Sequence, residues 1–342
     1  AGNSALLKPS EVTPFTAEYA IKLMHEAGIP RDVVQVIHGD GRAGAALVEH
    51  VDYIAFTGST ATGRKVAEVA AKRLIPYSLE LGGKDPCIVL EDADLDMTAA
   101  GLVRSAFENA GQVCISVERV YADARIYDAL MDKLQYCASK YQIGAGDGMD
   151  IHMGSMTNTR ELERTEAHIH DAISKGAQVI FGGRRRPDLG PLFFEPTILA
   201  DVDHSMDVMR QETFGPILPV MAFHTLEEAI RLANDSEYGL SASIFTRDLK
   251  GAEAIAKRLD TGDVSVNRPQ MVVATPSLPS GGQRNSGVGR RNGKEGLLRF
   301  THTQSFLTDS LFGQKPELRL ADPFSLQVAM VLRTIRRYIK FI

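Results

Sequence analysis

The feature that most constrains this chain is a regular alternation of extended and helical segments along almost all of its 342 residues. Near the amino end, an extended VVQVI precedes a helical AGAALVEH, an extended VDYIAFTG, a helical ATGRKVAEVAAKRL and an extended YSLEL. This is βαβαβ order, which in one sheet implies parallel strands joined by right-handed crossovers. The alternation therefore predicts an α/β fold.

The same reading extends to the rest of the chain. A first helix begins at Thr13 and Pro14 and ends at Gly28, with apolar residues at helical spacing between them. Further helices are predicted over residues 96–111, 127–142, 159–175, 225–235 and 248–260, extended segments over 119–126, 178–183, 217–223, 241–245 and 263–267, and a loop over 144–156. The pattern breaks at LGGKDP, so a domain boundary is predicted near residues 82–86.

Composition narrows the class of partner. A net charge of -5 without a long basic run argues against nucleic acid and leaves a small molecule as the expected ligand. Three cysteines without CxxC spacing suggest neither a disulfide framework nor a zinc site, so a reducing, cytoplasmic compartment is expected. No stretch reaches the roughly 18 apolar residues of a membrane span, so membrane insertion is not expected.

Cys114 is the candidate nucleophile. It lies in AGQVCIS, between a helical and an extended pattern, where nearby backbone N–H groups would favour the reactive thiolate. Most cysteines are buried small hydrophobes, so this residue alone leaves both interpretations open, whereas Cys87 and Cys137 fit the structural one. His168 and His170 face different sides of a helix and cannot share a metal, and no metal is expected.

Two carboxylates and one strand-to-helix turn complete the candidates. Glu80 ends an apolar strand at a glycine pair and could act as a general base if burial raises its pKa; Glu212 lies in QETFGP. Gly58 and Ser59 open a helix in FTGSTATGRK, an arrangement that suits a phosphate. Arg64 stands where a P-loop needs lysine, so an NTPase is rejected and an ordinary capped helix stays open.

Read together, these pieces resemble the aldehyde dehydrogenase superfamily from residue 1 to about residue 308. The motifs occur in family order: KPSEVTP, FTGST, ELGGK, AGQVC, ETFGP, YGLSASIFTRD and SGVGRRNGKEGLLRFT. Within the superfamily, GQVCISVERVY, GPLFFEPT and GVGRRNGKEGLL look most like bacterial succinate-semialdehyde dehydrogenases. The resemblance implies a partial Rossmann-type cofactor domain joined to an α/β catalytic domain.

The resemblance also implies a reaction. Cys114 would attack an aldehyde to give a thiohemiacetal, which passes hydride to nicotinamide and becomes a thioester that Glu80 hydrolyses by activating water. The cofactor contacts that it implies are Lys8, Glu11, Gly58, Ser59, Leu81, Gly82, Glu212 and Phe214. A carboxylate at Glu11 accepts hydrogen bonds from ribose hydroxyls but repels a 2′-phosphate, which favours NAD and leaves NADP open.

The chain departs from the family pattern in several places. Family members carry a longer stretch before residue 1, including cofactor-domain strands and an asparagine that stabilises the oxyanion. We therefore expect this chain to be poorly active or inactive, since losing an oxyanion donor costs on the order of 10²-fold to 10³-fold in rate. Glu108 replaces an arginine that holds a distal carboxylate, and Ser280 replaces a common phenylalanine, while Arg268 could supply an anchor. The substrate is expected to be an aldehyde, with a distal carboxylate left open.

Four segments are predicted: a partial dinucleotide-binding domain (1–82), a catalytic domain (83–285), a return to the cofactor domain with an oligomerisation strand (286–312), and a C-terminal tail with a probable helix (313–342). The tail's basic cluster of Arg333, Arg336, Arg337 and Lys340 suits a helix C-terminus. A homo-oligomer is expected for a full-length protein. The rival interpretation is a catalytically silent remnant that binds nucleotide or a partner. A third interpretation is a thiol esterase that uses only Cys114 and Glu80 and cleaves esters without NAD.

Overall fold

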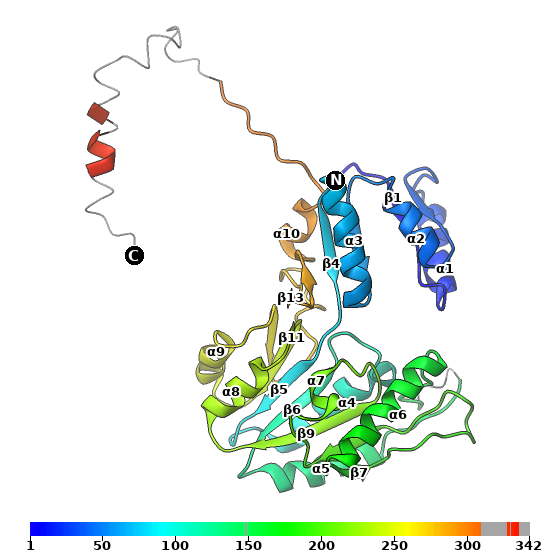
Figure 1. The fold of residues 1–342 in the computed structure, drawn as a ribbon, viewed down its shortest axis with the longest axis vertical. Helices are drawn as coiled ribbons and strands as arrows, with labels where there is room; N and C mark the ends of the chain where they lie inside the picture. Colours follow the sequence, from blue (N-terminus) through cyan, green and yellow to red (C-terminus); the bar gives the residue numbers. More distant parts are fainter. Residues whose placement is uncertain (147, 149, 309–326, 329, 335–342) are drawn as a thin grey trace. The chain divides into compact units, whose positions relative to one another are not determined.

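A computed structural model describes residues 1–146, 148, 150–308, 327, 328 and 330–334 of the chain. It has two compact units, Ala1–Thr301 and His302–Ile342. The first unit holds the α/β fold that the alternation predicts, and its main elements can be followed in Figure 1.

A seven-stranded sheet forms the centre of the first unit. Its order is β12 (Asp263–Val266), β11 (Ser241–Phe245), β5 (Asp85–Val89), β6 (Val117–Asp123), β9 (Ile217–Phe223), β8 (Thr197–Ala200) and β7 (Gln178–Phe181). All neighbours are parallel except β7, which pairs antiparallel with β8 at one edge. Pro86 lies at a register shift between β5 and β6, which is how a central strand tolerates a residue without an N–H group.

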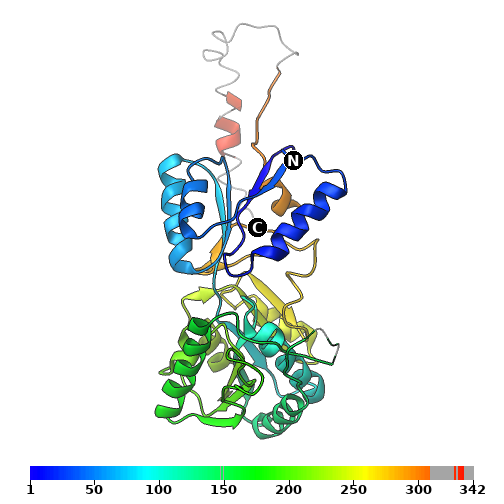
Figure 2. The ribbon, with the colours of Figure 1, turned by 90° about the vertical axis from the view of Figure 1, so that its right-hand side faces the viewer.

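Helices cover both faces of this sheet, as Figure 2 shows. They are α4 (Leu95–Phe107), α5 (Tyr127–Ser139), α8 (Leu226–Asn234) and α9 (Leu249–Ala256). The chain crosses from β5 to β6 in one direction and from β9 back to β11 in the other, so right-handed crossovers place α4 and α8 on opposite faces. The buried apolar cluster lies between residues 87 and 259 and follows this sheet and its helices.

Two of the three smaller sheets contain the strands at the amino end of the chain. A parallel pair joins β1 (Ala5–Leu7) to β2 (Val34–Val36), and a three-stranded sheet has the order β14 (Gly287–Val288), β4 (Tyr77–Glu80) and β3 (Ile54–Thr57). The helices here are α1 (Pro14–Glu26), α2 (Gly41–Leu47), α3 (Thr60–Arg73) and α10 (Gly293–Leu298). The strands of the βαβαβ pattern are parallel where they pair, and they are divided between these two sheets.

The remaining long helix is α6 (Thr159–Ser174). The short elements are η1 (Glu108–Gly111), α7 (Asp207–Arg210), and the antiparallel pair of β10 (Tyr238–Gly239) and β13 (Gln283–Arg284). The helix predicted over 96–111 ends earlier, at Phe107, because Asn109 and Ala110 adopt left-handed backbone angles that an α-helix cannot contain.

The predicted segment boundaries stay predictions. The one near 82–86 lies inside the first unit, where the chain passes from β4 to β5. Of the second unit, residues 302–308 form neither helix nor strand, and 327, 328 and 330–334 are helical. The tail helix proposed for 313–342, with Arg336, Arg337 and Lys340, otherwise falls outside the described residues.

Candidate active site

Cys114 lies on a tightly built loop between α4 and β6. Asn109, Ala110 and Gly111 follow one another with φ angles of 53°, 56° and 71°, a run of left-handed backbone that reverses the chain after α4. Residue 111 must be glycine, because a Cβ there would lie 2.2 Å from the carbonyl oxygen of Gly215. Left-handed non-glycine residues are costly and occur most often at functional sites.

Hydrogen bonds hold the same loop from its other side. The Gln112 side chain accepts from the Thr157 N–H at 2.8 Å and hydroxyl at 2.6 Å, and its amide donates to the Asn109 carbonyl at 2.9 Å. The Ser116 hydroxyl donates to the Ser105 carbonyl of α4 at 3.1 Å. The position of the half-buried Cys114 is therefore fixed by neighbours on both sides.

Glu80 ends β4 and is buried. Strand β14 returns to pair with it at Gly287, where a Cβ would lie 2.0 Å from the Leu79 carbonyl oxygen. The Arg291 guanidinium donates to Oε2 of Glu80 at 2.9 Å, while Oε1 is buried and has no hydrogen-bond partner among the described residues. Burial raises the pKa of the Glu80 carboxyl and Arg291 opposes that shift, which agrees with the expectation of a buried carboxyl.

Cys114 and Glu80 act on each other electrostatically. Burial raises the pKa of the Cys114 thiol to about 11, and the Asp85 carboxylate contributes in the same direction. Arg291 lowers that pKa, whereas Glu212 and Glu80 raise it. Desolvation and three carboxylates therefore outweigh one cation and disfavour the thiolate, contrary to the expectation for this position.

The glycine pair after Glu80 makes room for Glu212. A Cβ at Gly82 would lie 2.4 Å from Oε2 of Glu212, and the Gly83 N–H donates to Oε1 at 2.9 Å. A Cβ at Gly83 would also lie 2.5 Å from the carbonyl oxygen of Cys114. Burial raises the pKa of Glu212 to about 7, with a further contribution from Glu118. These contacts bring Glu80, Gly82, Glu212 and Cys114 into one cluster.

A buried ion pair fixes the loop that carries Glu212. Lys84, 1% exposed, donates to Oε2 of Glu118 at 2.5 Å. The Glu118 carboxylate also accepts the N–H groups of Thr213 at 2.8 Å and Phe214 at 2.9 Å. Phe214 has a φ of 54°, so the carboxylate holds a strained backbone in place next to Glu212.

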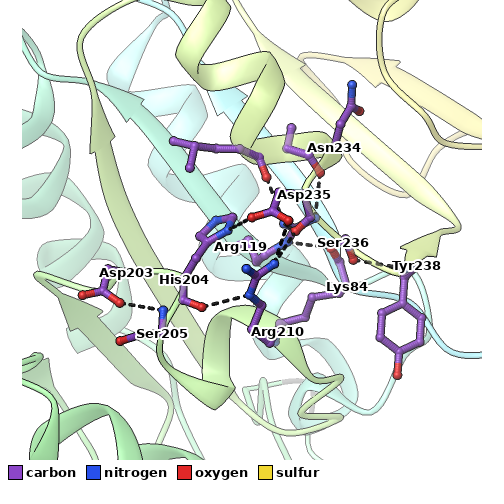
Figure 3. A network of polar contacts seen from close by, with 12 residues as sticks. Lys84, Arg119, Asp203, His204, Ser205, Arg210, Asn234, Asp235, Ser236 and Tyr238 are labelled. Carbon is purple, nitrogen blue, oxygen red and sulfur yellow. Dashed lines mark hydrogen bonds and ion pairs between the residues drawn. The ribbon is translucent and has the colours of Figure 1, made fainter.

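Arg119 ties this loop region to the rest of the sheet, as Figure 3 shows. Its Nε donates to the Lys84 carbonyl at 2.9 Å, and its other nitrogens donate to the carbonyl oxygens of Leu232 and Ala233 at the end of α8. Beside it, Asp235 accepts from His204 and Arg210, each at 2.8 Å. Arg119 therefore acts as a C-terminal cap for α8 and as a support for the segment after Glu80.

The predicted adenosine contacts lie at the end of β1. Lys8 donates to the carbonyl oxygens of Pro9 at 2.6 Å and Gly39 at 2.8 Å, and lies 3.5 Å from the exposed carboxylate of Glu11. A hollow of about 260 Å³ lies beside them, lined by Pro9, Ser10, Glu11, Pro14, Phe15, Glu18, His38 and Gly39. A carboxylate at the edge of such a hollow can accept hydrogen bonds from a sugar.

The predicted phosphate contacts lie at the start of α3. Ser59 is its N-cap and accepts from the Thr62 N–H at 3.3 Å, and the Gly58 N–H donates to the Glu80 carbonyl at 3.1 Å. Leu81 packs on this helix, because a Cβ at Gly63 would lie 2.5 Å from its Cδ2. The helix start and the candidate base are thus joined directly.

The residues singled out for substrate choice lie apart from one another. Glu108 is exposed and lies 3.9 Å from Arg104, and Arg268 is exposed. Ser280 is buried and donates to Asp263 at 2.5 Å, so its side chain is occupied by a structural hydrogen bond. Among the described residues, no hydrogen bond or ion pair joins Glu108 or Arg268 to the Cys114 cluster. The Ser280 main chain, in contrast, pairs with Arg291, which donates to Glu80.

Sequence reasoning did not single out Arg291, Lys84, Glu118 or Arg119. For Glu118 and Arg119 a signal was present, because two charges interrupt the apolar run SVERVYA of β6, and charges in a buried strand need partners. Within the described residues, the structure contains no group of three or more His, Cys, Asp or Glu side chains arranged to hold a metal. In the part of the chain that was searched, no helix is long and apolar enough to span a membrane.

Residues 1–306 match the family model described as the aldehyde dehydrogenase family. A Mycobacterium ulcerans protein that carries the name of a succinate-semialdehyde dehydrogenase, NADP(+), is 42% identical over 320 residues, which cover 93% of this chain and 62% of that protein.

Two solved structures extend the comparison. Lactaldehyde dehydrogenase from Escherichia coli has a TM-score of 0.84 at 41% identity, covering 89% of this chain and 64% of its own. Betaine aldehyde dehydrogenase from Staphylococcus aureus in complex with NAD+ has a TM-score of 0.82 at 35% identity, covering 91% and 64%. The chain therefore spans slightly less than two thirds of these relatives.

Proposed function

The chain belongs to the aldehyde dehydrogenase family, and from this premise we propose that its site oxidises an aldehyde to the carboxylic acid with Cys114 as nucleophile and Glu80 as base. The observation that carries the proposal is the cluster of Cys114, Glu80 and Glu212 around one glycine pair. The cluster combines a thiol, a buried carboxyl with a free oxygen, and a second carboxyl beside them.

The described residues fit a nicotinamide dinucleotide. The hollow at Glu11 suits a ribose, and the start of α3 offers N–H groups and a positive dipole end for a pyrophosphate. The buried Glu212 carboxyl suits a second ribose. When bound, such a cofactor supplies the hydride acceptor, and this chain's residues hold it against the reacting carbon.

The chain's own groups then perform two nucleophilic steps. The Cys114 sulfur bonds to the aldehyde carbon and its thiol proton is transferred to the carbonyl oxygen, giving a thiohemiacetal. Loss of the hydride to a bound nicotinamide and of the hydroxyl proton to solvent leaves a thioester. Glu80 then takes a proton from water as the water oxygen bonds to the same carbon. The carbon–sulfur bond breaks, the sulfur leaves as thiolate, and the acid is released. One aldehyde, one NAD+ and one water give one acid, NADH and a proton.

For the cofactor we propose NAD in preference to NADP. The support is the exposed Glu11 carboxylate at the hollow, which would repel a 2′-phosphate. The name of the M. ulcerans relative specifies NADP(+), whereas the S. aureus enzyme binds NAD+ in its structure, so relatives alone do not decide. Fluorescence titration with each cofactor should give the lower Kd for NAD, and a lower Kd for NADP would contradict the assignment.

For the substrate we propose a short aldehyde with a distal carboxylate, succinic semialdehyde being the named example among relatives. Comparison of kcat/KM for succinic semialdehyde and an uncharged aldehyde of equal length tests this class. Equal values, or a preference for the uncharged aldehyde, would show that Glu108 has the effect expected from its charge and would remove the distal carboxylate from the proposal.

We propose weak turnover for the 342-residue chain by itself. The support is the thiol pKa of about 11 and the exposure of Phe15, Tyr19, Leu23 and Met24 on α1 of the proposed cofactor domain.

The proposal of a homo-oligomer for a longer form is supported by Phe306 and Leu307, which are 87% and 92% exposed in the segment expected to pair with another copy. A single sedimenting monomer at high concentration of a longer form would contradict it.

The experiment that tests the reaction is single-turnover NADH formation with enzyme in excess of aldehyde. Cys114→Ser should abolish the NADH signal, whereas Cys137→Ser, which changes a half-buried thiol on α5, should leave it intact. If the parent forms no NADH, alkylation distinguishes the silent remnant: NAD-dependent labelling of Cys114 supports the enzyme site, and equal labelling of Cys114 and Cys137 supports the remnant.

A further inference from the structure

Among the described residues, Arg291 is the one cation that contributes substantially to the pKa values of both Glu80 and Cys114, the proposed base and nucleophile. It donates to Oε2 of Glu80 at 2.9 Å across 211 residues of sequence. It is also the charge that opposes Asp85, Glu212 and Glu80 at the Cys114 thiol. The arrangement of the proposed nucleophile and base depends on where this guanidinium lies.

The backbone of Arg291 is held firmly. Its N–H donates to the Ser280 carbonyl at 2.7 Å, and its carbonyl accepts the Ser280 N–H at 2.8 Å. Ser280 is in turn fixed by its hydroxyl bond to Asp263. Two backbone hydrogen bonds to Ser280 therefore fix the main chain of Arg291, which limits the positions that its guanidinium can reach.

The contact divides the two oxygens of Glu80. Oε2 is taken by Arg291, and Oε1 is buried without a partner among the described residues. Space beside Oε1 is kept by Gly281, where a Cβ would lie 3.3 Å from that oxygen and 2.7 Å from the Gly289 carbonyl oxygen. An unpaired buried oxygen is costly, so a free acceptor in a fixed direction indicates a site for a hydrogen-bond donor such as water.

We propose that Arg291 is the positioning residue of the Glu80 base: it holds Oε2 so that Oε1 alone receives a proton from water, and its charge favours the ionised forms of Glu80 and Cys114. The inference rests on the proposed function. In the hydrolytic step, a water proton goes to Oε1, the water oxygen bonds to the thioester carbon, and the sulfur leaves as thiolate. Arg291 makes no covalent bond and keeps its own proton throughout.

The test uses the 342-residue chain and 4-nitrophenyl acetate without cofactor. The burst of nitrophenolate measures acetylation of the thiol, and the steady state measures hydrolysis of the thioester. Glu80 acts when ionised, so hydrolysis rises with pH through its pKa. Arg291→Gln should move that rise up by about one pH unit, since a nearby opposite charge lowers a carboxyl pKa by about 1–3 units.

Three companion variants separate positioning from a structural role. Arg291→Lys keeps the charge but loses the planar set of guanidinium N–H donors. Its pH profile of hydrolysis should therefore lie between those of the parent and Arg291→Gln. Arg290→Gln is the matched control, because the Arg290 guanidinium donates to the carbonyl oxygens of Gly282 and Gly289, and its profile should equal the parent's. In a Glu80→Gln background, Arg291→Gln should cause no further change in hydrolysis.

The outcomes are distinguishable. If the Arg291→Gln protein folds and the pH at which its thioester hydrolysis rises equals that of the parent, the inference is overturned and the proposed function still stands. If Arg291→Gln does not fold, an Arg291→Lys protein with the parent's burst and hydrolysis profile assigns Arg291 a structural role only. A nitrophenolate burst that persists in the Cys114→Ala variant contradicts the proposed function and with it this inference.

Discussion

Glu212 is a carboxyl group that the folded chain buries at a cost to its stability. Its folded pKa is about 7, above the ordinary 4.5, so the folded state binds more protons than the unfolded state between those values. Stability is therefore lost as pH rises from 4.5 to 7. Glu212→Gln removes this loss, and the variant should exceed the parent by up to roughly 3 kcal/mol above pH 7, at about 1.4 kcal/mol per pKa unit.

Urea unfolding of parent and variant at pH 4.5 and pH 8 measures this difference directly. Other titrating groups are common to both proteins and cancel in the comparison. A stability difference that is the same at both pH values would show that Glu212 ionises normally in the folded chain and would contradict the raised pKa.

The buried pair of Lys84 and Glu118 is the second residue-scale test. Glu118→Gln leaves the Lys84 charge buried without a counter-charge, and removing one partner of such a pair costs about 3–5 kcal/mol. Guanidinium unfolding should show that loss. The exposed pair of Glu253 and Lys257 offers a control, and Glu253→Gln should leave the unfolding midpoint unchanged. Equal effects of the two substitutions would contradict the importance of burial.

At this scale the sequence alone indicated Cys114, Glu80 and Glu212 through motif order, and the structure places them in one cluster. It did not indicate Arg291, because a contact across 211 residues leaves no local pattern and Arg291 is one of three basic residues in GRRNGK. Nor could it give the thiol pKa, which depends on burial and on the sum of four neighbouring charges.

At the scale of elements, the loop between α4 and β6 sets the place of the thiol. Gly111→Ala should destabilise the chain more than Gly176→Ala. Both glycines have positive φ, but a Cβ at 111 meets the Gly215 carbonyl at 2.2 Å, whereas a Cβ at 176 meets nothing within 4 Å. Gly176→Ala should cost about 1 kcal/mol through backbone strain alone.

Alkylation of Cys114 by iodoacetamide provides the functional readout for that pair. Gly111→Ala should slow it by displacing the loop, and Gly176→Ala should not. Equal rates and equal stabilities in the two variants would mean that the close approach to Gly215 does not constrain the loop.

Several elements follow from local pattern and others do not. Helices α3, α6 and α8 agree with their predictions because capping residues and apolar spacing are both present. Strand β5 was missed because Asp85 and Pro86 hide a fully buried strand, and β8 because four residues carry little periodicity. The split of β1 and β2 from β3 and β4 depends on tertiary pairing that element order does not specify.

At the scale of the whole first unit, buried apolar side chains are concentrated in one part of the chain and sparse in the rest. Its cluster of buried apolar side chains lies within residues 87–259, while the buried apolar residues before Cys87 are Ile21, Ile54, Ala70, Leu79 and Leu81. Amides of α1 should therefore exchange through low-energy local opening, whereas amides of β5 and β6 should exchange only on global unfolding. Native-state hydrogen exchange measures this, and uniform protection of α1, β5 and β6 would contradict it.

The family match over residues 1–306 includes both the sparsely packed part before Cys87 and the seven-stranded sheet. The two walls of the proposed site come from different sheets. Glu80 ends a strand of the three-stranded sheet, and Cys114 precedes β6 of the large one.

The central claim is that Cys114 and Glu80 work as one reacting pair, and mass spectrometry of the acetylated protein tests it most directly. After mixing with 4-nitrophenyl acetate, Glu80→Gln should carry one lasting acetyl group, mapped to the peptide of Cys114, while the parent loses the same group by hydrolysis. Acetyl groups on Cys137 instead, or equal loss from parent and variant, would contradict the account.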